Sequence, residues 1–78
     1  MDAEWWRAHG PQVKRRLTKG EKLVPTQPKH ALSIALEVQD QMDAHGYPDW
    51  WHRLLRLQRD AEYRIMLDSY GVAERQDW

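Results

Sequence analysis

The chain has 78 residues, no cysteine and no phenylalanine, and its 12 basic and 12 acidic side chains give a net charge of zero. This length predicts one domain without a large enclosed pocket, and the lack of cysteine excludes disulfides and thiolate metal sites. No apolar run approaches the roughly 18 residues that span a bilayer. The acidic N-terminus is unlike a secretory signal, so we expect no membrane partner and a cytoplasmic location.

Charge is distributed unevenly along the chain. Residues 1–30 hold seven basic and three acidic side chains, a net charge of +4, and the remaining residues have a net charge of −4. Such asymmetry indicates either a nucleic-acid or protein partner, or a basic arm that folds against the acidic remainder of its own chain. We favour pairing within the chain, because nucleic-acid-binding domains usually carry a clear net positive charge.

The first 28 residues are predicted to form a basic arm that ends in a proline-containing linker. Gly10-Pro11 predicts a break between a short first segment and a short, weakly amphipathic helix, and Gly20 predicts the end of that helix. Residues 21–28 contain two prolines and are interpreted as the linker. We expect this arm to be loosely attached.

The strongest helical pattern covers residues 29–44. Its apolar side chains fill an arc of roughly 200° on a helical wheel, which is wider than a simple surface stripe. The arc contains Ala31, Leu32, Ile34, Ala35, Leu36, Val38 and Met42. More than one neighbour is therefore expected to cover this helix.

Residues 48–70 are predicted to form a second, longer helix that ends at Gly71 and is followed by a tail over 71–78. One broad stripe should face the core. This stripe contains Trp50, Trp51, Leu54, Leu55, Leu57, Ala61, Ile65 and Met66. The four-residue connector predicts an antiparallel hairpin with the helix before it. Since two helices cannot bury stripes this wide, we expect an all-α bundle in which the N-terminal helix packs on the hairpin through Trp5 and Trp6.

A second apolar strip lies on the arginine-rich side of the longer helix. Tyr63, Leu67 and Tyr70 recur at i, i+4 and i+7, at a point where this helix should extend past its shorter partner. An overhang that is apolar on two sides needs cover, either from Trp78 and the tail or from a second molecule.

We therefore predict a small, non-catalytic protein–protein interaction module that acts as a homodimer or as an accessory subunit of a larger assembly. Its surface should combine the residue types that dominate interface energetics, which are Trp, Tyr and Arg. The predicted partner-binding residues are Tyr63, Leu67, Tyr70, Arg56, Arg59 and Trp78.

The alternative is a nucleic-acid-associated protein whose basic arm contacts phosphates while tryptophans stack on unpaired bases. The residues of that site would be Lys14, Arg15, Arg16, Lys19, Lys22, Trp5 and Trp6. A third hypothesis is an inhibitor that presents acidic and aromatic surfaces to a nucleic-acid-binding target. A compact, cysteine-free chain would suit a phage or mobile-element protein, although no residue demonstrates that origin.

No pattern indicates catalysis, a cofactor or a small-molecule substrate. There is no cysteine nucleophile, both serines fall in predicted helices, and no glycine-rich phosphate loop is present. His45, Asp49 and His52 lie within eight residues and could approach a divalent metal. We favour the simpler role of Asp49 as a carboxylate at a helix N-terminus, and we predict no metal site.

Overall fold

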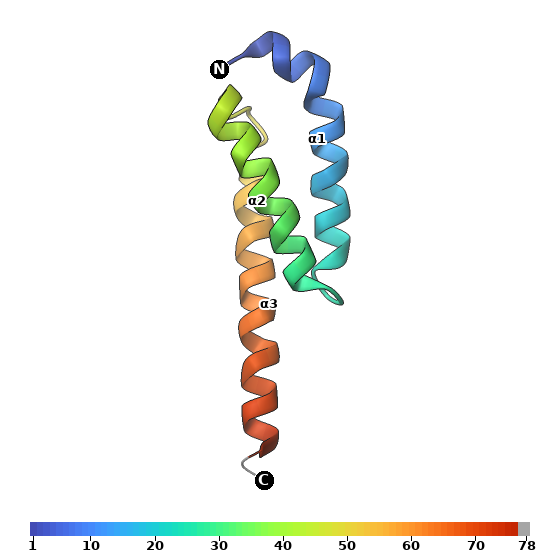
Figure 1. Cartoon of the computed structure of the whole chain (residues 1–78), viewed down its shortest axis with the longest axis vertical. Helices are drawn as coiled ribbons and strands as arrows, with labels where there is room; N and C mark the ends of the chain where they lie inside the picture. The colour runs from blue at the N-terminus through green and yellow to red at the C-terminus, as the bar shows by residue number, and fades with distance from the viewer. Residues whose placement is uncertain (77–78) are drawn as a thin grey trace.

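The computed structural model describes the backbone of residues 1–76 and the side chains of residues 1–70. This part of the chain is all-helical and consists of α1 (Ala3–Leu23), α2 (Pro28–His45) and α3 (His52–Gln76). Successive helices run in opposite directions, and α1 and α3 both pack against α2 (Figure 1). The predicted small bundle, an antiparallel hairpin with an N-terminal helix packed on it, is confirmed.

The predicted break at Gly10-Pro11 is wrong, because α1 continues through both residues. Proline normally disfavours helical backbone in the preceding residue, partly through a clash with that residue's Cβ. Gly10 has no Cβ and avoids that part of the clash. The first turns of α1 lean across the top of the bundle before the helix turns downward (Figure 1), a change of direction that a proline inside a helix accounts for.

The expectation of a loosely attached arm is also wrong, since α1 supplies one side of the core. Its buried residues follow one another at alternating spacings of four and three, which keeps them on a single face. They are Trp6, Gly10, Val13, Leu17 and Gly20. Two of these five are glycines, so the face is longer than its apolar residues suggest. The connection to α2 is correspondingly short and covers residues 24–27.

The prediction that Gly20 ends α1 is wrong. This glycine instead permits the three helices to approach closely. A Cβ at this position would lie 2.8 Å from Leu57 Cδ2 of α3 and 3.3 Å from Ile34 Cγ2 of α2. The first distance is shorter than Cβ contacts in real structures, and both neighbours are buried. Glycine is therefore required by space here rather than by backbone conformation.

The central helix α2 is buried along most of its inner side, as its wide apolar arc predicts. Pro28 occupies the start of the helix, where its missing N–H leaves no hydrogen bond unmade. At the other end Gly46 has a φ of 95°, which favours glycine, and its N–H donates to the Met42 carbonyl at 2.7 Å. Leu36, predicted in the arc, is half exposed because it lies at the edge that neither neighbour covers.

The longest helix, α3, buries Leu54, Leu57 and Ala61 against the other two helices. It begins at His52 rather than at the predicted Pro48, because Pro48 and the two tryptophans after it form a turn. Both tryptophans were predicted to lie in the core, but they are only partly buried and pack on its edge. At the far end α3 continues past Gly71 to Gln76, since one glycine costs a helix only about 1 kcal/mol.

Aromatic rings pack together at the end of the bundle where α1 begins and α2 meets α3. The Trp6 indole N–H donates to the carbonyls of His45 and Gly46, each at 3.1 Å, so the buried ring is also hydrogen-bonded. Trp6 meets the Trp50 ring edge-on at 5.4 Å. The Trp5 ring stacks on His45 with 3.8 Å between the centroids. We call this region the closed end.

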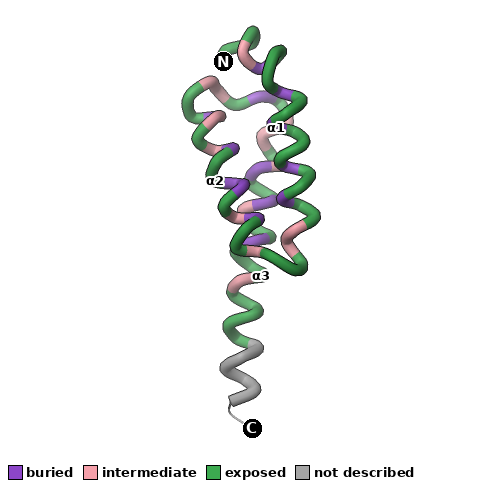
Figure 2. Tube along the Cα trace, turned by 45° about the vertical axis from the view of Figure 1, so that its right-hand side comes forward, coloured by how far each residue is buried: buried purple, intermediate pink, exposed green. Residues whose placement is uncertain are grey.

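The opposite end of the molecule consists of α3 alone. Figure 2 shows buried positions along the three-helix part and exposed positions along the projecting helix. The principal dimensions are 56 × 17 × 15 Å, so the projection makes the molecule a rod. Among the described residues, no helix is both long and apolar enough to cross a membrane. We call the stretch of α3 from residue 62 onward the overhang; the first residues of α2, Pro28 and Lys29, lie beside its inner side, and beyond them α3 is alone.

Candidate interaction surface

The candidate surface is the side of α3 that points away from α1 and α2. Residues three and four apart lie on the same side of a helix, which places this surface opposite the buried Leu54, Leu57 and Ala61. We define the outward face of α3 by its exposed members, which are Leu55, Arg56, Arg59, Tyr63, Met66, Leu67 and Tyr70. The face begins beside the three-helix core and continues along the overhang.

The overhang carries the most apolar part of this face. Exposed fractions are 57% for Tyr63, 44% for Met66, 41% for Leu67 and 60% for Tyr70. Isolated exposed apolar residues are ordinary on protein surfaces, whereas a contiguous group on one helix side is typical of a contact surface. This group spans two helical turns without interruption.

The structure brings together five of the six residues that the sequence predicts for partner binding. Arg56 and Arg59 are exposed and continue the line of Tyr63, Leu67 and Tyr70 toward the start of α3. The sixth residue, Trp78, lies outside the described residues.

Two residues of the outward face were predicted to be buried. Leu55 is 46% exposed and Met66 is 44% exposed, because α1 and α2 cover only one side of α3. Their spacing contains the signal that could have placed them correctly. Met66 lies three residues after Tyr63 and four before Tyr70, and Leu55 lies four before Arg59. Both therefore belong to the exposed strip rather than to the core stripe.

Charge along α3 is separated into two blocks. Residues 52–59 contain three arginines and no acidic residue, whereas residues 60–70 contain three acidic residues and one arginine. Within the second block Arg64 forms an exposed ion pair with Asp68 at 3.4 Å. The outward face is thus flanked by positive charge near the core and by mainly negative charge along the overhang.

Two open grooves of about 410 Å³ each adjoin α3. One is lined by His52, Leu55, Arg56, Arg59 and Asp60 and forms part of the outward face. The other lies on the inner side, where α2 begins beside the overhang, and is lined by Pro28, Lys29, Ile65, Asp68 and Ser69. Both are shallow surfaces of a kind that a side chain of a partner can enter.

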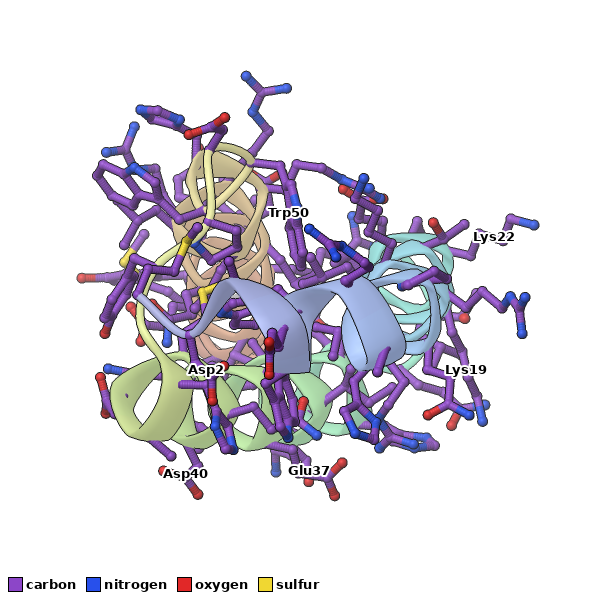
Figure 3. The ribbon with its side chains drawn as sticks, turned by 90° about the horizontal axis from the view of Figure 1, so that it is seen from above. Asp2, Lys19, Lys22, Glu37, Asp40 and Trp50 are labelled. Atoms are coloured by element: carbon purple, nitrogen blue, oxygen red, sulfur yellow. The ribbon has the colours of Figure 1, made fainter. Side chains whose placement is uncertain are left out.

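The basic residues of α1 do not form one free surface. The Lys14 ammonium lies 5.3 Å from the centre of the Trp50 ring, and Arg16 pairs with Glu37 of α2. Arg15, Lys19 and Lys22 are exposed at helical spacing, and Figure 3 shows Lys19 and Lys22 pointing away from the other two helices. The expected pairing of the basic arm with the acidic half thus occurs at Arg16.

The two tryptophans assigned to the nucleic-acid alternative are already engaged inside the protein. Trp6 is 7% exposed and hydrogen-bonded to α2. The half-buried Trp5 lies against two histidine rings, with centroid distances of 3.8 Å to His45 and 4.5 Å to His9. Neither ring offers a free face for base stacking in this arrangement.

The histidines near the α2–α3 turn also have aromatic partners. His45 stacks on Trp5, and the His52 ring lies 4.2 Å from the Trp51 ring. Among the described residues, no three His, Asp or Glu side chains converge in a way that could hold a metal. In the same turn a hydrogen bond from the Tyr47 hydroxyl to Asp43 raises the pKa of Tyr47.

Comparison with known proteins gives no relative for this arrangement: no protein-family model, curated protein or solved structure matches the chain.

Proposed function

We propose that the protein is a non-catalytic protein–protein interaction module that binds its partner through the outward face of α3. The observation that carries the proposal is the overhang, a helix segment that leaves the bundle and exposes Tyr63, Met66, Leu67 and Tyr70 on one side. Both versions of the module, a homodimer and an accessory subunit, use this same face.

The composition of the face supports a protein partner. Aromatic, methionine and arginine side chains are enriched in the buried centres of protein interfaces, and lysine is depleted there. The outward face contains two tyrosines, two arginines and a methionine, and no lysine. An exposed amphipathic helix is also the element that recurring helix-in-groove interfaces use.

The shape of the molecule supports the same proposal. The three-helix part buries Leu54, Leu57 and Ala61 without any contribution from the overhang's outward side. The exposed apolar residues of the overhang therefore add nothing to the core of the monomer. Their burial by a partner would gain about 25 cal/mol for each Å² of apolar surface removed from water.

Site-specific photo-crosslinking in cells that express the protein tests this proposal. A benzophenone amino acid replaces Leu67 on the outward face, and in a control variant it replaces Lys19 on α1, which is also exposed. We expect a discrete protein adduct at position 67, either with another chain or with a second copy. Equal labelling at the two positions, or no protein adduct at position 67, would contradict the proposal.

The same control variant addresses the nucleic-acid alternative. Arg15, Lys19 and Lys22 form an exposed basic stripe on α1, which is the feature that favours this second function. A nuclease-sensitive adduct at position 19, with none at position 67, would identify nucleic acid as the partner and α1 as the binding surface.

A further inference from the structure

The charges beside the outward face of α3 are arranged so that a reversed copy of the helix matches them. Arg59 lies within the face, and Glu62, three residues later, lies at its edge. Both side chains are exposed. Around them the positive block 52–59 is followed by the mainly negative block 60–70, so the face runs from positive to negative along the chain.

We propose that the partner of this face is a second copy of the same chain, bound antiparallel across a two-fold axis level with Ala61. The inference rests on the proposed function and names its partner. Such a two-fold pair brings identical edges of the two helices together in opposite directions. The positive block 52–59 of each copy then lies beside the mainly negative block 60–70 of the other, whereas a parallel pair would place like blocks side by side.

Helix geometry sets the register. In a reversed copy, Arg59 lies within about 1.5 Å of the level of Glu62 in the second copy. The two-fold axis repeats this pair, which makes two ion pairs. Complementary charges of this kind fix orientation and register more than they add affinity.

The centre of the face supplies the contact area. In the same register, Tyr63 of each copy is level with Arg59 of the other, so the guanidinium can lie on the phenol ring. The exposed Leu55 is level with Leu67 of the second copy, and each overhang lies beside the three-helix part of the other copy. The pairing therefore covers the outward face from one end to the other.

Charge reversal tests the pairing in the full-length protein. Sedimentation and light scattering should give twice the chain mass of 9.4 kDa. Arg59→Glu places like charges at two symmetric sites and should weaken self-association at least about tenfold. The double variant Arg59→Glu/Glu62→Arg restores both pairs and should recover the dimer. Arg15→Glu on α1, a matched change of charge at another exposed site, should have no effect.

Introduced cysteines test the orientation, because the chain has no thiol of its own. A tagged Arg59→Cys chain mixed with an untagged Tyr63→Cys chain should form a mixed disulfide under mild oxidation. Tyr70→Cys should not crosslink to itself, since the two copies of residue 70 would be about 27 Å apart along the helix axis. Self-crosslinking at position 70 would instead indicate a parallel pair or a two-fold axis nearer the helix end, and would overturn the inference.

A monomeric mass at millimolar concentration would also overturn it, as would a dimer that is unaffected by Arg59→Glu. If the protein is monomeric but crosslinks at position 67 to a different protein, the interaction module remains and its partner is not a second copy. Circular dichroism of each variant separates these outcomes from unfolding.

Discussion

The closed end and the overhang contain similar residue types but use them in opposite ways. At the closed end Trp6 is 7% exposed and both its ring and its N–H are engaged, whereas Tyr63 and Tyr70 on the overhang are 57% and 60% exposed. The contrast also occurs between neighbours within α3, since Leu54 is 2% exposed and Leu55 is 46% exposed. What decides burial is therefore the number of helices alongside a residue, and not its hydrophobicity.

The largest expected effect is at Trp6. Trp6→Ala removes a buried ring and the hydrogen bond to the Gly46 carbonyl, while the His45 carbonyl still accepts from the Asp2 N–H, and replacements of this kind cost about 3–5 kcal/mol. This is comparable to the whole stability of a domain of this size, roughly 3–5 kcal/mol. We expect the variant to be largely unfolded at 25 °C by circular dichroism. Trp5→Ala, at a half-exposed ring nearby, should unfold at a much higher urea concentration than Trp6→Ala.

A smaller effect is expected where the three helices approach most closely. Gly20→Ala places a methyl group 2.8 Å from Leu57 Cδ2, and overpacking of a core costs about 1–3 kcal/mol. The gain in helix propensity offsets about 1 kcal/mol of this cost. We expect a net loss of about 1 kcal/mol in urea unfolding. Gln12→Ala, at an exposed position of the same helix, should leave stability nearly unchanged, and a stabilised Gly20→Ala would show that the helices can move apart freely.

The smallest effect is expected on the overhang. Leu67→Gln should change the free energy of unfolding by less than about 0.5 kcal/mol, because the side chain has no neighbour within the monomer's core. The measurement belongs in an Arg59→Glu background, so that self-association does not contribute. A loss of more than about 1 kcal/mol in the free energy of unfolding would show that the overhang stabilises the monomer as the closed end does.

The sequence predicts the hairpin well and the N-terminal helix poorly, for an identifiable reason. In α2 and α3 the buried positions are occupied by apolar side chains, so their periodicity is visible. In α1 two buried positions are occupied by Gly10 and Gly20, which add nothing to an apolar pattern and resemble breaks. Pro11 adds to that resemblance. The sequence pattern therefore predicts a break at each glycine, although α1 has one continuous buried face.

The exposed residues of the candidate surface could also be predicted only in part. Tyr63, Leu67 and Tyr70 could be predicted because they stand among polar residues at helical spacing. Leu55 and Met66 share that spacing but also border the core stripe, and the sequence gives the width of an apolar arc but not how much of it the neighbouring helices cover. The Arg59–Glu62 pair and the charge blocks around it become informative only once the exposure of this face is known.

The gathering of indole rings at the closed end has a spectroscopic consequence. Trp5, Trp6, Trp50 and Trp51 all lie at that end, whereas Tyr63 and Tyr70 lie on the overhang. In a Trp78→Phe background, indole emission would come from one pole of the rod alone. Melting of the closed end could then be followed by indole fluorescence and compared with a helix-sensitive signal, which sums over all three helices.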